Sequence, residues 1–411
     1  MPTSTSEVTT DPVTAEEDEP VPPFFNTTFS THRVSPLYVG VDKLTPQRLG
    51  VLGRRLRDTL VGDVVRGIQI GLESTDTPAG QVGPLRSVKL RWFRANAVLG
   101  DEVDYDNDTG MDTWDALSES QKRGLWIEIR HENAAYVAIL LPGVGSKDTR
   151  ATWRMQPGQS VEATGDDGFV HLPLMLLRMP MALKGVISEW LAGTFDCRVS
   201  KLALGTRTLV AVWEDWIRTV GVSPRGMDPV ITLAFNAPLP EPESVFDDNN
   251  DPDAMQEDEY DEHNSRPGLR SLEVTIQPKE LAKFVRVGKT GSSRPTAGAA
   301  GAYWEKDVRE RRRLAGASTD DGWAWLASED RQQPFTDGLA RYLDHHLGLN
   351  VFHPSVRVTQ ISCGGFVLGA ARLKIVAPGQ QMTDAKSRAS WMFVTRLSHR
   401  IQGDGLPTIF T

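Results

Sequence analysis

The chain has 411 residues, 39% of them hydrophobic, and a formal net charge of −9 at pH 7. That length suffices for one large domain or two to three smaller ones, and the longest apolar runs, such as 136–141, are too short to span a bilayer. The acidic N-terminus has neither the basic segment nor the apolar core of a signal peptide. Two cysteines, Cys197 and Cys363, are typical of a reducing compartment, the cytosol or the nucleus.

The negative charge is concentrated in two segments. Residues 1–23 carry six acids and residues 241–263 carry eleven, and neither segment contains Lys or Arg. Without these 17 acids, 37 acids remain against 45 Lys and Arg, which predicts a basic folded body. A basic body suits nucleic acid or an acidic partner. The alternative is that the acidic loops only keep the protein soluble.

The first part of the chain predicts strands and one helix. Residues 1–23 are expected to be a disordered acidic tail, because they lack an apolar period. FFNTTFSTHRVSPLYVG (24–40) predicts a strand, which Ser35-Pro36 should interrupt at an edge or a bulge. TPQRLGVLGRRLRDTLV (45–61) predicts a helix with Thr45 as N-cap and an apolar face of leucines. Further strands are predicted over 64–72, 87–98, 125–132 and 134–143.

The second part, from about residue 165, follows a different order of elements. Helices are predicted over 182–195, 209–220 and 334–348, the last with Gly348 as the residue after its C-terminus. Strands are predicted over 197–204, 229–235, 271–276, 351–369, 372–376 and 389–401, and a Gly-rich loop over 288–302. Because strands come in runs without βαβ alternation, the sequence predicts an α+β fold with antiparallel sheets.

These elements suggest an N-terminal α+β half over 24–150 and a C-terminal α+β half over 165–411. Flexible insertions are expected at 241–265 and 288–325.

Two motifs resemble catalytic sites without meeting their requirements. GKTGSS (288–293) lacks a phosphate-binding loop's first glycine, because position 283 is Lys. Asp344, His345 and His346 are consecutive on a predicted helix, so their side chains point in different directions. We therefore expect a protein that is not an enzyme and has no catalytic, cofactor-binding or metal-binding residue.

EKDVRERRRLAG (305–316) is a candidate phosphate-binding or DNA-binding segment, since guanidinium groups suit phosphate contacts. Its basic residues are Lys306, Arg309, Arg311, Arg312 and Arg313, and Lys283, Arg286, Lys289 and Arg294 precede them. The alternative is a solvated helical face with local pairing to Glu305 and Glu310. Among the eleven Trp residues, Trp304, Trp323 and Trp325 lie in charged sequence and are candidate exposed anchors for a partner.

Four segments taken in order closely resemble CENP-L of filamentous fungi, a family of inner-kinetochore subunits in the constitutive centromere-associated network. They are FFNTTFSTHRVSPLYVG, LRDTLVGDVVRGIQIGL, LPLMLLRMPMALKGVISEWLAGTFDCRVSKLAL and PFTDGLARYLDHHLGLNVFHPSVRVTQISCGGFVLG. The resemblance extends over most of 24–400. It implies curved, largely antiparallel sheets and a nuclear, non-enzymatic scaffold at the centromere that pairs with CENP-N, the subunit that recognises the centromeric nucleosome.

The resemblance also places the pairing segment at ASWMFVTRL (389–397), read as a C-terminal strand. Its candidate partner-binding residues are Trp391, Met392, Phe393, Val394 and Arg396. A strand that is apolar on both faces invites addition of a strand from another chain. The alternative is that it completes its own sheet.

The expected function is therefore a scaffold that pairs with CENP-N and helps assemble the network on centromeric chromatin. Other inner-kinetochore subunits, centromeric DNA or nucleosomes, and a second copy of the chain are further candidate partners, and no membrane is expected. The alternative is a DNA-binding or DNA-processing protein acting independently of the kinetochore, in which Asp344 and His345 would serve the site.

Overall fold

The structure of the chain is a computed structural model with an α+β fold, as the sequence predicted. It describes residues 21–40, 43–65, 82–95, 98, 122–142, 168–221, 226–235, 269–290, 307–315, 322–323, 325, 333–377, 394 and 397. The helices within these ranges are α1 (Pro46–Val65), α3 (Met181–Phe195), α4 (Thr206–Val220), α5 (Pro278–Thr290), α7 (Val308–Ala315) and α8 (Pro334–Leu347).

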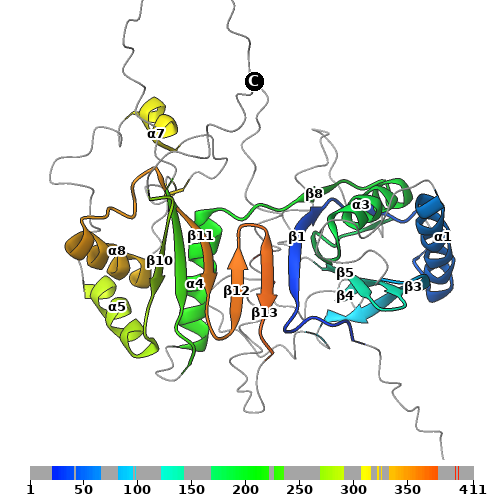
Figure 1. Ribbon diagram of the computed structural model, residues 1–411, viewed down its shortest axis with the longest axis horizontal. Helices are drawn as coiled ribbons and strands as arrows, with labels where there is room; N and C mark the ends of the chain where they lie inside the picture. Colours follow the sequence, from blue (N-terminus) through cyan, green and yellow to red (C-terminus); the bar gives the residue numbers. More distant parts are fainter. Residues whose placement is uncertain are drawn as a thin grey trace, which may run out of the picture.

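Eleven strands form one open, antiparallel sheet in the order β10-β9-β11-β12-β13-β1-β7-β5-β4-β3, with β8 paired to β1 (Figure 1). The first strands along the chain are β1 (Thr28–Val34), β3 (Leu85–Arg94), β4 (Arg123–His131), β5 (Ala135–Leu141), β7 (Leu174–Arg178) and β8 (Val199–Lys201). The others are β9 (Val230–Phe235), β10 (Ser271–Thr275), β11 (Val356–Ser362), β12 (Phe366–Gly369) and β13 (Arg372–Ile375). A separate ribbon pairs β2 (Leu37–Tyr38) with β6 (Phe169–Val170).

Strand β1 lies in the middle of the large sheet. It pairs with β7 along one edge, and with β13 and then β8 along the other, where Phe29 lies opposite Leu373. Strands from the ranges 24–150 and 165–411 therefore share one sheet. Pro36 has no N–H for a ladder, and the chain leaves the sheet after Val34 to form β2. The predicted interruption is present, but it ends a central strand.

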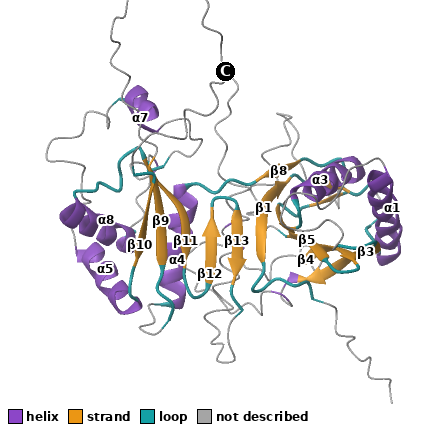
Figure 2. Cartoon of the chain, viewed as in Figure 1, coloured by secondary structure: helices purple, strands orange, loops and turns teal. Residues whose placement is uncertain are grey.

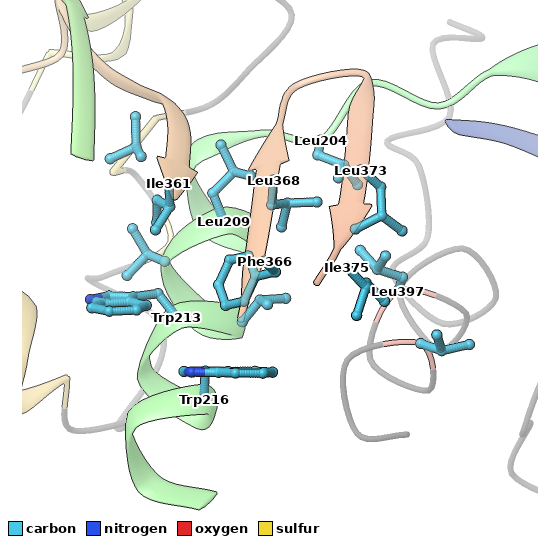
Figure 3. Packing of buried hydrophobic residues seen from close by; sticks show 14 of the residues in the cluster. Leu204, Leu209, Trp213, Trp216, Ile361, Phe366, Leu368, Leu373, Ile375 and Leu397 are labelled. Carbon is cyan, nitrogen blue, oxygen red and sulfur yellow. The ribbon is translucent and has the colours of Figure 1, made fainter. Parts of the chain in front are cut away.

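Two hydrophobic cores lie on opposite faces of this sheet. Helices α1 and α3 contribute buried leucines to one core, together with alternate residues of β4, β5 and β7. Helices α4 and α8 contribute to the other core, which extends along β9, β11, β12 and β13. Figure 3 shows Trp213 and Trp216 of α4 beside Phe366 of β12, with ring centroids 6.3 and 5.0 Å away.

On the face of the sheet that carries α1 and α3, no described helix covers the centre. In Figure 2, α1 and α3 lie at the β3 end, α5 and α8 lie at the β10 end, and β12, β13 and β1 lie between them. On this central face Thr28 and Arg372 are exposed, and Ser30 and Lys374 are half-buried.

Helix α1 begins where the sequence predicted. The Arg48 N–H donates to the hydroxyl of Thr45 at 3.3 Å, which is an N-cap bond. Four leucines at three-to-four-residue spacing are buried against β3 and β4, namely Leu49, Leu52, Leu56 and Leu60. The helix extends to Val65, so the strand predicted over 64–72 is wrong at its first two residues, and 66–72 lie outside the described residues.

Helix α5 was not predicted, and the loop expected over 288–302 is wrong at Gly288, Lys289 and Thr290, which form its last turn. The helix has apolar residues at helical spacing, Leu281, Phe284 and Val285, of which Leu281 is buried. The expectation of exposed tryptophans is also wrong for two of three positions. Trp323 and Trp325 are 4% and 6% exposed, while Trp304 lies outside the described residues.

Candidate functional site

The C-terminal segment is described at two positions, Val394 and Leu397, and both are buried. Their exposed fractions are 3% and 0%, and both belong to the core shared with α4 and β13. In Figure 3, Leu397 lies next to Ile375 of β13. Both residues are helical, so the predicted strand is not present at these positions. Trp391, Met392, Phe393 and Arg396 lie outside the described residues.

A sequence signal for this helical conformation was available. Trp391, Val394 and Leu397 recur every three residues, which places them on one face of a helix and on alternating faces of a strand. The burial of Val394 and Leu397 therefore identifies the face of this segment that contacts its own chain.

The basic run is helical and begins at an aspartate cap. The N–H groups of Arg309 and Glu310 contact Asp307 Oδ1 at 2.8 and 3.4 Å. Glu310 accepts two hydrogen bonds from Arg313, at 2.6 and 2.9 Å, and these bonds lower the pKa of the Glu310 carboxyl. The expected local pairing is thus present at Glu310, while Glu305 lies outside the described residues.

Helix α7 presents several arginines to solvent. Arg309, Arg312 and Arg313 are exposed and Arg311 is half-buried, while Lys306 lies outside the described residues. Figure 1 shows α7 set apart from the sheet and the other helices. The earlier basic residues Lys283, Arg286 and Lys289 lie on α5, which is remote from α7 in that view. The two basic segments therefore do not form one patch.

The glycine of the GKT sequence has a packing role. A Cβ at Gly288 would lie 1.7 Å from the carbonyl oxygen of Pro334, and one at Gly338 would lie 2.2 Å from that of Phe284. Helices α5 and α8 therefore cross at a separation that excludes side chains at both glycines. The close helix crossing accounts for the glycine at position 288, so this glycine does not indicate a phosphate-binding loop.

Asp344, His345 and His346 are exposed at the C-terminal end of α8. Gly348 follows in the left-handed conformation, with φ of 62°, and its N–H donates to the carbonyl of Asp344, as the sequence predicted. The His346 ring lies 4.3 Å from the Tyr342 ring. In the described part of the chain, no cluster of three or more His, Cys, Asp or Glu has the arrangement of a metal site.

One buried carboxyl has the altered acidity often seen at active sites. Burial raises the pKa of Glu214 in α4 to about 7, with a smaller contribution from Asp337, while hydrogen bonds from Thr336 and Phe335 oppose the rise. Its oxygens accept bonds from the Thr336 N–H and hydroxyl, both at 2.8 Å. Gln333, the N-cap residue of α8, makes no side-chain cap bond. Glu214 therefore caps α8 from a neighbouring helix, which is a structural role.

The large sheet itself is strongly basic. Its eleven strands contain twelve Lys and Arg and only two acids, Glu128 and Glu273. Four of these bases, Arg86, Lys89, Arg91 and Arg94, lie on β3 at the end of the sheet. The sequence alone does not reveal this excess of basic over acidic residues in the sheet, because the bases are spread from residue 33 to residue 374.

The fold and the site thus define a protein with basic surfaces built on an open antiparallel sheet and with a buried carboxyl used in packing. Comparison with protein families identifies it further: the family model of CENP-L, Centromere protein L, matches residues 23–402. The chain belongs to the CENP-L family, a structural family of the kinetochore, and is a centromere protein with a role in chromosome segregation. No curated protein matches the chain.

None of the described helices combines the length and the apolar character needed to cross a membrane. The family match covers the four segments that carry the sequence resemblance, and it also spans 241–265 and 288–325, which the sequence predicted to be flexible insertions.

Proposed function

We propose that this chain is a non-enzymatic inner-kinetochore scaffold that pairs with a CENP-N homologue and helps assemble the centromere-associated network on centromeric chromatin. The observation that carries the proposal is the CENP-L family match over residues 23–402. The wide open sheet supports it, because uncovered sheet faces and edges offer large contact areas for other subunits.

The proposed contact with CENP-N is the C-terminal segment, through Trp391, Met392, Phe393 and Arg396. Val394 and Leu397 are buried in the chain's own core and would anchor the segment. Aromatic and Arg residues are the usual anchors of protein interfaces. An aspartate in place of Phe393 would put a charge into such a contact, which is costly when the charge has no partner.

Co-expression with the CENP-N homologue, followed by size-exclusion chromatography with light scattering, tests this proposal. The wild type is expected to form a stable one-to-one complex that Phe393→Asp abolishes. Met227→Asp is the matched control, because Met227 is 72% exposed and precedes β9 by three residues. A complex that survives in Phe393→Asp places the interface elsewhere, and no complex with the wild type contradicts the pairing.

Direct contact with centromeric DNA is a second proposed property. The exposed arginines of α7 favour it, since they project from the body of the protein on a helix of their own. Binding through phosphate contacts should weaken steeply as salt rises. The acidic segment 241–263 is proposed to shield basic surfaces, so deleting it should raise DNA affinity; unchanged affinity would count against shielding.

A further inference from the structure

A hollow lies on the central uncovered face of the sheet, where β1, β7 and β13 meet the first turns of α3. It has a volume of about 240 Å³, and its lining includes Thr28, Ser30, Lys184 and Arg372. Two of these residues carry hydroxyl groups and two carry positive charges. The lining includes no residue of the C-terminal segment or of α7, and no function described above uses the hollow.

The strand register places the polar groups around the hollow on one face. Ser30 lies opposite Arg372 of β13, and Thr28 lies opposite Lys374. Residues that lie directly opposite each other across a ladder share a face, whereas neighbours along a strand alternate. Phe29 and Arg178 also border the hollow. By this alternation their side chains belong to the other face, so they contribute main chain.

Two further cations, Lys201 and Lys374, lie on the same face. Lys201 of β8 is opposite His32 of β1, two residues beyond Ser30. The pKa of His32 is lowered, first by burial and then by the charges of Lys184 and Lys201, while a bond to the Ser30 carbonyl opposes this. The charges of Lys184 on α3 and Lys201 on β8 thus both reach His32 of β1, the strand that forms the floor of the hollow.

The described strands around the hollow carry charge of one sign. Strands β1, β7, β8 and β13 contain no Asp or Glu. On α3 the acid is Glu189, which is exposed and lies five residues beyond Lys184, and so on another side of the helix. We define the cationic hollow as this cavity with Lys184 and Arg372 in its lining and Lys201 and Lys374 beside it.

We propose that the cationic hollow binds a phosphoryl group carried by a phosphorylated serine or threonine of a partner protein. A phosphorylated side chain carries nearly two negative charges and three acceptor oxygens. The guanidinium of Arg372 offers a planar fork of donors that matches such oxygens, and the Lys184 ammonium adds a second charge. The hydroxyl of Thr28 completes the set with a neutral donor.

The size and arrangement of the hollow favour a single side chain over a DNA backbone. Pockets for drug-sized ligands start at about 300 Å³, so a cavity of 240 Å³ suits one phosphoryl group and its stem. Duplex DNA carries a charge every ~1.7 Å along its axis and binds best to extended arrays of cations. The lining of the hollow instead has two cations, Lys184 and Arg372, on either side of a single cavity, which suits one phosphoryl group better than a row of phosphates.

The test is a titration of the full chain with the tripeptide acetyl-Gly-phosphoSer-Gly-amide. Binding is monitored through the ³¹P NMR signal of the peptide. The wild type is expected to broaden and shift the signal in a saturable way. Loss of both charges in Lys184→Gln with Arg372→Gln should weaken binding by about tenfold or more, because charge-assisted hydrogen bonds are lost. Arg372→Gln alone, at an exposed position, should give a smaller loss and serves if the double variant unfolds.

The matched control removes two charges elsewhere, with Arg309→Gln and Arg312→Gln on α7, and should bind the peptide like the wild type. The proposal is overturned if the wild type shows no saturable change, or if both double variants lose binding equally. A short double-stranded DNA forms the second arm. If the hollow variant loses affinity for DNA while the phosphopeptide never binds, the hollow contacts nucleic acid and the phosphoprotein proposal is wrong.

Discussion

Replacing Glu214 by glutamine should change how stability depends on pH. The carboxyl of Glu214 is 5% exposed and accepts hydrogen bonds from Thr336 and Phe335 at the N-terminus of α8. Burial raises its pKa from 4.5 to about 7, and the nearby Asp337 adds to the rise. Glutamine keeps a carbonyl oxygen for the same N–H groups but cannot ionise.

The sign of the effect follows from the raised pKa. The folded state holds the proton of Glu214 more tightly than the unfolded state does, so ionisation favours unfolding. The stabilisation that this proton gives is complete below about pH 4.5 and is lost as the pH rises through about 7. Between about pH 5 and about pH 8 the loss amounts to about 2.5 kcal/mol, at about 1.4 kcal/mol per pKa unit.

Denaturant unfolding followed by tryptophan fluorescence measures this at several pH values. The free energy of unfolding of Glu214→Gln, minus that of the wild type, should rise by about 2.5 kcal/mol from about pH 5 to about pH 8. Glu189→Gln, at an exposed position of α3, is the control and should show no such rise. A difference that stays constant across this range would refute the assignment of a buried, proton-holding carboxyl.

Two further predictions concern α8 and α7. Gly338→Ala should destabilise the chain by about 1–3 kcal/mol in denaturant unfolding, because its Cβ would meet main chain of α5. Gly50→Ala, on α1 with nothing within 4 Å, should stabilise it by about 0.5–1 kcal/mol, and equal effects would contradict the close helix crossing. Arg312→Gln should lower DNA affinity and reduce the slope of log affinity against log salt by about 1 in fluorescence anisotropy titrations. Lys279→Gln on α5 should change neither, and an Arg312→Gln variant with wild-type binding would remove α7 from the DNA contact.

Local signals in the sequence predicted most elements correctly. Thr45 and the spacing of the leucines after it predicted α1, and Gly348 predicted the end of α8. Such signals are local, because caps and amphipathic periods are determined by nearby residues. The antiparallel α+β class followed from the order of elements. Helix α5 was not predicted although its apolar residues have helical spacing, because Gly288 in its last turn is typical of a loop.

The arrangement of strands could not be predicted, because pairing between distant segments leaves no local signal. Nothing near Phe29 indicates that Leu373 lies opposite it, 344 positions later. The cationic hollow depends on this pairing, since Arg372 and Ser30 meet only across β1 and β13. The basic run on α7 was predictable because its residues are adjacent in sequence. Burial of Val394 was not predicted, because its segment was assigned the period of a strand.

The central claim is that this CENP-L family member acts at the centromere through a CENP-N homologue. Chromatin immunoprecipitation of the tagged full chain in its own cells, with and without depletion of that homologue, tests it most directly. We predict enrichment on centromeric DNA that depletion of the homologue removes, and that Phe393→Asp reduces to the same extent. Enrichment that persists without the homologue, or none above bulk chromatin in its presence, would contradict the claim.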